Sequence, residues 1–179
     1  MNERSVALFI HLLGVVSLFI AIGMVQRLGT KIRSTSSVEE LRLWLGLVRT
    51  TAPMFPVAAL VILASGLYMA ARSFSFETPW IVVAIGAVVV MMILGGTLLR
   101  RGMAAMGKEA GSAGSFTPEL ARAVANPTPW GVLGLNSGMS MGLLWIMVNK
   151  PGWAQSIGVV VVLGVIGAVA AVAATKSKR

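Results

Sequence analysis

Five long apolar stretches, each free of Asp, Glu, Lys and Arg, alternate with shorter polar segments along the chain. Each stretch supplies about 20 helical residues, enough to cross a hydrocarbon core of about 30 Å at a rise of about 1.5 Å per residue. Apolar runs of this length are typical of transmembrane helices. The pattern therefore predicts an all-α, polytopic membrane bundle, a single domain (1–179) with transmembrane helices at residues 5–26, 50–71, 78–99, 129–149 and 153–174.

The polar segment between the first two spans, residues 37–49, has a helical pattern of its own. Ser37 and Glu40 have the spacing of a capping box. Two interpretations of this segment remain open. It is either an amphipathic helix that lies on the inner membrane surface, or a helical extension of the second span that bends into the membrane at Pro53 and Pro56. Its apolar stripe consists of Val38, Leu41, Leu45 and Val48.

The composition supports the membrane assignment. The chain is 56% hydrophobic and 12% charged, whereas a soluble domain carries about 25% charged residues. A net charge of +9 would suggest a nucleic-acid partner in a soluble protein, but here the basic residues lie in loops and at helix ends. We therefore expect the lipid bilayer, and no nucleic acid, as the partner. The absence of cysteine excludes disulfides, thiolate metal sites and cysteine nucleophiles.

The basic residues also predict the orientation of the chain. The first loop, the third loop and the segment after the fifth span hold 12 of the 15 Lys and Arg residues. By the positive-inside rule, the N-terminus lies outside and the C-terminus in the cytoplasm of a multi-pass inner (plasma) membrane protein. The first span is longer than a signal-peptide core and no A-x-A site follows it, so we expect a retained helix.

The fourth span carries two rows of residues that suit lipid poorly. Gly134, Gly138 and Gly142 repeat every four residues and form a smooth row that another helix can approach closely. Asn136 and Ser140 form a second row, about 160° from the glycines at about 100° per residue. We therefore expect neighbouring helices on both sides of this span.

The fifth span is also rich in small residues. Gly164 and Gly167 each precede an alanine by four residues, which predicts a second packing face. The pattern leaves open whether this face packs within the bundle or between subunits. A homo-oligomer or a larger membrane complex is the expected partner in the second case.

The only histidine of the chain, His11, lies inside the first span. It shares a helical face with Ala7, Gly14 and Ala21, so we expect this face to be buried. An ionisable residue within the membrane indicates a candidate functional site. Three interpretations remain open for His11: a hydrogen bond to another helix, ligation of haem or metal, and handling of a proton or substrate.

Depth in the membrane suggests partners for His11. Ser65 and Tyr68 of the second span reach a similar level, as do Ser140 and Met141 of the fourth. A cluster of these side chains is permitted by the topology, although helix rotation is not readable from the sequence. The eleven methionines raise the possibility of Cu(I), which thioethers suit, but their spacing favours adaptable packing.

Three sequence pieces carry a resemblance to known proteins: IHLLGVVSLFIAIG, PVAALVILASGLYMA and LLWIMVNKPGW. They resemble a group of small bacterial integral membrane proteins without an assigned function, itself similar to the helical bundles of the copper-resistance-D and membrane-bound protoporphyrinogen-oxidase type. The resemblance implies a helical-bundle fold and a haem b at His11. A second axial ligand would then come from Met141 or from His11 of another copy. The third span lacks the lysine of the oxidases, so the resemblance does not extend to their activity.

The sequence favours a non-catalytic accessory or structural membrane subunit over an enzyme. No nucleophile–base pair, carboxylate pair or metal triad is recognisable, and no catalytic residue is assigned. One alternative is a haem- or copper-binding membrane protein that uses His11. Another is a small-solute transporter with a polar cavity beside Ser65, Tyr68, Asn136 and Ser140.

Overall fold

The computed structural model describes residues 2–176, apart from the side chains of residues 73 and 176, and the regular structure in this range is helical throughout. The elements are α1 (Glu3–Ser34), α2 (Val38–Thr51), α3 (Met54–Ser73), α4 (Pro79–Leu94), the π-helical segment η1 (Gly95–Leu99), α5 (Arg100–Ser112), α6 (Pro118–Ala125), α7 (Pro127–Asn149) and α8 (Trp153–Lys176).

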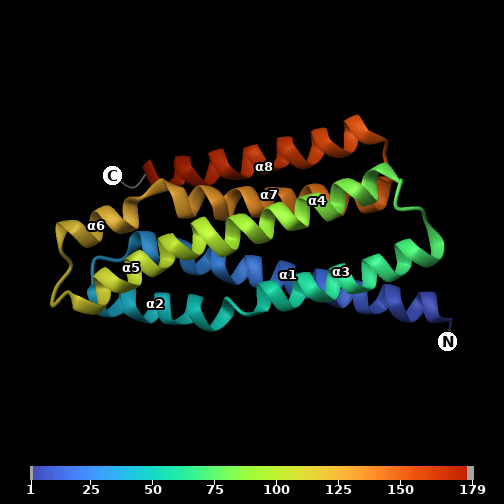
Figure 1. Ribbon diagram of the computed structural model, residues 1–179. Helices are drawn as coiled ribbons and strands as arrows, with labels where there is room; N and C mark the ends of the chain where they lie inside the picture. The colour runs from blue at the N-terminus through green and yellow to red at the C-terminus, as the bar shows by residue number, and fades with distance from the viewer. Residues whose placement is uncertain (1, 177–179) are drawn as a thin grey trace.

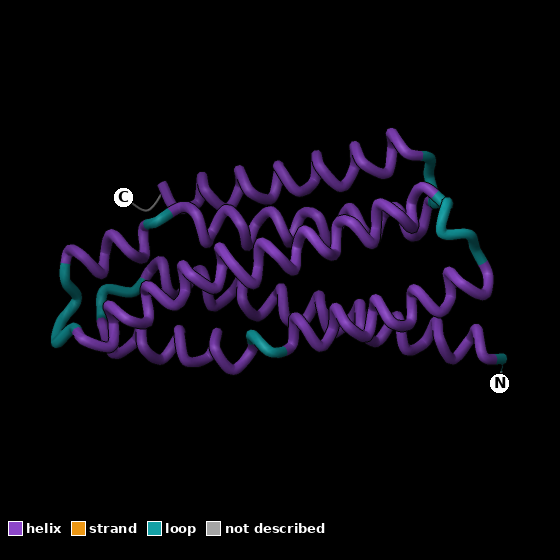
Figure 2. Tube along the Cα trace, in the orientation of Figure 1, coloured by secondary structure: helices purple, strands orange, loops and turns teal. Residues whose placement is uncertain are grey.

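These elements form five long rods that lie side by side (Figure 1). The rods are α1, α2 with α3, α4 through η1 to α5, α6 with α7, and α8, and each is long and apolar enough to cross a membrane. The prediction of an all-α bundle with five such helices is confirmed. The turns and loops lie at the two ends of the bundle, apart from the short breaks between α2 and α3 and between α6 and α7 (Figure 2).

The rods are longer than the predicted spans. Helix α1 has 32 residues and continues to Ser34, and the α4–η1–α5 rod has 34 residues. At about 1.5 Å per residue these rods reach roughly 50 Å, well beyond a hydrocarbon core of about 30 Å. The excess forms one end of the bundle, which we call the head: residues 27–51 and 100–126.

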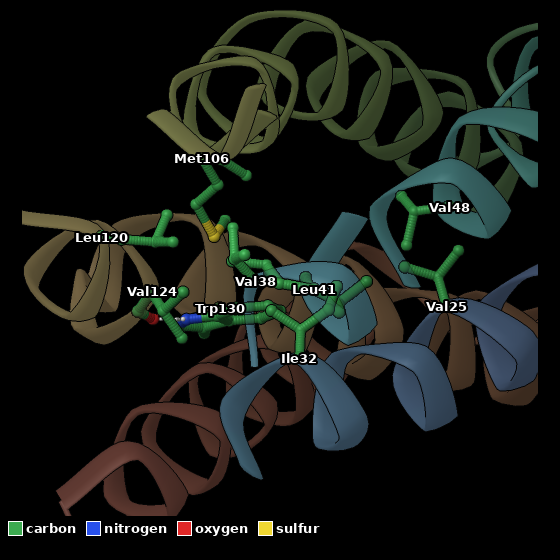
Figure 3. Packing of buried hydrophobic residues seen from close by; sticks show 11 residues of the cluster. Val25, Ile32, Val38, Leu41, Val48, Met106, Leu120, Val124 and Trp130 are labelled. Carbon is green, nitrogen blue, oxygen red and sulfur yellow. Dashed lines mark hydrogen bonds between the residues drawn. The ribbon is translucent and has the colours of Figure 1, made fainter. Parts of the chain in front are cut away.

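A hydrophobic core fills the head and extends into the adjoining turns of α1 and α7, which explains why the helices continue past the predicted spans. Trp130 is fully buried at its centre, and its ring N–H donates to the carbonyl oxygen of Val124 at 2.8 Å (Figure 3). Burying this apolar surface stabilises the folded head at about 25 cal/mol per Å². The core draws on α1, α2, α5, α6 and α7 through Val25, Ile32, Val38, Leu41, Val48, Met106, Ala110, Leu120, Val124, Trp130 and Leu133.

Residues 37–49, for which two interpretations were open, form most of helix α2. Its buried stripe, which includes Val38, Leu41 and Val48, packs against protein in the head core. It runs in line with α3, from which Ala52 and Pro53 separate it. Helix α2 therefore continues the line of the second span and packs against the head core, as the extension interpretation predicts.

Candidate functional site

His11 packs against α3 and is 8% exposed. Its Nδ1 lies 3.1 Å from the carbonyl oxygen of Ile62 and 3.2 Å from Ser65 Oγ. Because a carbonyl oxygen only accepts, Nδ1 carries the proton and donates it across the helix contact. Gly66 makes room for the ring, since a Cβ atom there would stand 3.2 Å from His11 Cε1. Of the predicted partners of His11, the structure brings Ser65 into contact.

A mostly apolar groove of about 590 Å³ runs beside this contact, between α1 and α3. Ala7, Ile10 and Ser65 line its inner part, and Glu3 and Tyr68 line its outer end. The Tyr68 hydroxyl donates to Glu3 Oε2 at 3.0 Å, so Tyr68 ties α3 to the first turn of α1. Tyr68 thus has a partner other than His11.

The two residues predicted at this depth on α7 lie elsewhere. Met141 is 55% exposed, and the contacts that hold His11 come from α3. Ser140 is buried, and its hydroxyl donates to the carbonyl oxygen of Asn136 at 2.8 Å. Within one chain the structure therefore does not assemble a His11–Met141 ligand pair, and the residues present do not fit a haem held by two side chains of one subunit. Within residues 2–176 no three His, Asp or Glu side chains gather where they could hold a metal ion.

Asn136 lies at a second polar contact, between α7 and the α4–η1 rod. Its Nδ2 donates to the carbonyl oxygen of Met91 at 3.3 Å. Its Oδ1 is buried and has no hydrogen-bond partner among the described residues. Gly95 lies beside this contact, and a Cβ atom on Gly95 would stand 3.5 Å from Nδ2, an ordinary van der Waals distance.

The π-helical segment η1 begins at this same Gly95, and the sequence analysis missed it. The N–H of Gly95 reaches the carbonyl oxygens of both Met91 and Met92. Short π segments inside helices occur frequently at functional sites. The sequence signal that could have indicated this irregular segment is the Gly95–Gly96 pair, which interrupts a span of bulky apolar residues.

A further polar link joins α1 to α7. Gln26 Nε2 donates to Ser137 Oγ at 2.8 Å, and the Ser137 hydroxyl donates to the carbonyl oxygen of Leu133 at 2.7 Å. Neither residue was among the predicted site residues. The predicted polar cavity is thus divided between two places. Ser65 and Tyr68 of α3 line the α1–α3 groove and bond to residues of α1. Asn136 and Ser140 of α7 do not line this groove, and their hydrogen bonds go to Met91 and within α7.

The glycine rows of α7 and α8 face each other within one chain. A Cβ atom on Gly134 would overlap the carbonyl oxygen of Gly167, and one on Gly142 would stand 2.8 Å from the Cα of Val160. From the other side, a Cβ atom on Gly164 would stand 2.9 Å from Met139 Cγ. The small faces of the fourth and fifth spans therefore pack inside the bundle, with α8 on one side of α7 and the α4–η1 rod on another.

Comparisons with protein-family models, with curated proteins and with solved structures found no match for this chain. The resemblance noted in the sequence therefore stays a prediction.

Proposed function

We propose that this chain is a non-catalytic structural or accessory subunit of a complex in the inner membrane. One observation carries the proposal: polar side chains inside the spans bond to neighbouring helices. His11 reaches α3, Gln26 reaches α7, and Asn136 reaches α4. Bonds of this kind hold membrane helices together and each contributes about 0.6–2 kcal/mol. The groups that could have formed a reactive site thus serve to fasten the bundle.

The peripheral position of α8 supports a role within a complex. Only 11% of the residues in the most apolar part of α8 are buried, against 44% in the corresponding part of the α6–α7 rod. Val161, Val165 and Val169 are each more than half exposed. Because the glycine face of α8 is already packed against α7, a second membrane chain would meet this valine face.

The mass of the protein in a native-like bilayer tests the proposal. The full chain is extracted directly into copolymer nanodiscs, without detergent, and its mass is measured by native mass spectrometry. A subunit role predicts particles with more than one polypeptide. A homogeneous monomer, both in nanodiscs and in mild detergent, contradicts it.

Single cysteines locate the contact, since the chain has none of its own. Val165→Cys on α8 should crosslink to the partner in membranes. Leu12→Cys, which is 50% exposed on α1, is the matched control and should crosslink less.

A haem- or copper-binding function of His11 is the second candidate, and one observation favours it. Histidine ligands of metals are usually oriented by a hydrogen bond from the other ring nitrogen, as Nδ1 of His11 is by Ile62. A second copy would have to supply the other axial ligand. The absorbance spectrum of freshly purified protein decides: a Soret band or stoichiometric copper that is lost in His11→Ala supports ligation, and the absence of both removes it.

A further inference from the structure

A cleft of about 310 Å³ opens in the head, where the end of α1, helix α6 and the end of α8 meet. It lies at the opposite end of the bundle from the α1–α3 groove. Two arginines, Arg33 from α1 and Arg122 from α6, line it. The remaining lining residues are Thr35, Phe116, Ala121, Val124, Ala125, Ala174 and Thr175.

Arg33 is held in place by the head core. Its guanidinium carbon lies 4.9 Å from the centroid of the Trp130 ring, and its Nε is buried with no hydrogen-bond partner among the described residues. The ring is itself fixed, because its N–H bonds to Val124 and its edge packs on Gly29. A buried N–H donor of a charged group without a partner is unfavourable. Arg33 is therefore a positioned cation that lines the cleft, and its unpartnered Nε is covered by protein.

Arg122 faces the same cleft from a more exposed position. Its Nη2 pairs with Glu119 Oε1 at 2.6 Å, and the side chain is 75% exposed. Its Nε donates to the carbonyl oxygen of Pro118 at 3.4 Å, and these two acceptors use only part of the five N–H donors of a guanidinium. The hydroxyls of Thr35 and Thr175 already donate, to Glu40 Oε2 and to the carbonyl oxygen of Val172. The unused donors of the cleft are therefore those of the two arginines.

We propose that this cleft binds a phosphate group, that of an anionic phospholipid headgroup. Guanidinium groups bind phosphate oxygens through paired N–H donors. The cleft lies beside Ala174 and Thr175, in the last turns of a membrane-spanning helix, where headgroups are found. Its apolar walls, Phe116 and Val124 among them, suit the glycerol and acyl portion of a lipid. Basic pockets between helix ends at the inner face bind anionic headgroups in this way.

Native mass spectrometry of the purified full chain tests the site with defined probes. Phosphatidylglycerol and phosphatidylcholine are titrated separately, and inorganic phosphate forms a third arm. We expect one phosphatidylglycerol molecule to bind at least tenfold more tightly than phosphatidylcholine. Arg33→Gln and Arg122→Gln should each weaken phosphatidylglycerol by roughly fivefold, as the loss of one basic residue near anionic lipid does.

Two further variants distinguish a built site from general attraction to the basic head. Arg101→Gln removes an exposed charge of α5 that does not line the cleft, and it should leave the affinity unchanged. Arg33→Lys retains the charge but not the planar fork, so it should weaken binding even where the fold is intact by circular dichroism. Equal losses in Arg33→Gln and Arg101→Gln, or no preference for phosphatidylglycerol, overturn the proposal. Binding of inorganic phosphate that displaces the lipid retains the phosphate site but overturns the lipid as its source.

Discussion

The backbone of Leu163 lies so close to Gly138 that a Cβ atom on this glycine would overlap the Leu163 carbonyl oxygen. Helices α7 and α8 therefore meet backbone to backbone. We expect Gly138→Ala to push the two helices apart and to lower the free energy of unfolding by about 1–3 kcal/mol, as overpacking does. Unfolding in mild detergent, followed by circular dichroism, measures this loss.

Gly158 of α8 is the matched control for this substitution. No atom lies within 4 Å of the position that its Cβ would take. Gly158→Ala should therefore leave the protein unchanged or stabilise it by up to about 1 kcal/mol through helix propensity. Equal effects of the two alanines would contradict the close packing at Gly138.

How far the sequence predicts this molecule depends on whether a feature is local. The glycine row at Gly138 and the polar row at Asn136 repeat along one helix, so the central place of α7 could be predicted from them. The partner of Asn136, the carbonyl oxygen of Met91, depends on which helix lies beside α7 and how that helix is rotated. The π segment that begins at Gly95 lies beside this contact, and it was missed although the Gly95–Gly96 pair is a local signal for it.

The helices run past the predicted span ends, because a charge marks where a span leaves the apolar core and not where its helix ends. The first span was expected to end at residue 26, just before Arg27, but α1 continues to Ser34. Ile32 is fully buried in the head core, which requires contacts from α2 and α7 that no local pattern contains. Depth matching correctly paired His11 with Ser65, but it could not give the rotation that turns Met141 outward.

Arg42 joins α2 to the end of α5, and its removal should loosen the head. Its Nε donates to the carbonyl oxygen of Ala110 at 2.8 Å, and its Nη2 donates to that of Ala113 at 2.7 Å. Carbonyls at a helix C-terminus lack partners within the helix and attract cations. We expect Arg42→Met to lower the free energy of unfolding by about 1.5–3 kcal/mol, as loss of charged hydrogen bonds does.

The control for Arg42 lies on the same helix. Arg49 is exposed in the last turn of α2, and Arg49→Met should change the stability by less than about 0.5 kcal/mol. Proteolysis of the folded protein gives an independent readout, with faster cleavage around residues 113–117 in Arg42→Met alone. Similar stability and cleavage of the two variants would show that the hydrogen bonds from Arg42 to the end of α5 do not stabilise the head.

Asn136 should be replaceable by leucine with little loss of stability. The substitution gives up the bond to Met91, worth about 0.6–2 kcal/mol, but it also removes the buried, unpartnered Oδ1, which costs about 1–3 kcal/mol. In this variant the Met91 carbonyl oxygen still accepts a hydrogen bond from the N–H of Gly95. Asn136→Asp should be clearly destabilising, because it places a carboxylate beside that carbonyl. The hydrogen bond to Met91 accounts for a loss of at most about 2 kcal/mol in the free energy of unfolding. A larger loss in Asn136→Leu would indicate that Oδ1 is bound by a ligand or water.

The orientation of the bundle can be tested with two single cysteines at its opposite ends. The head and the C-terminal segment hold most of the basic residues, so the positive-inside rule predicts that the head lies in the cytoplasm. Ser75, between α3 and α4, and Ser115, between α5 and α6, are both exposed. In intact spheroplasts a membrane-impermeant maleimide should label Ser75→Cys, whereas Ser115→Cys should react only after lysis. The unsubstituted chain is the control, because it contains no cysteine to react. The reverse labelling pattern would place the head outside, where the headgroups of the inner leaflet could not reach the Arg33–Arg122 cleft.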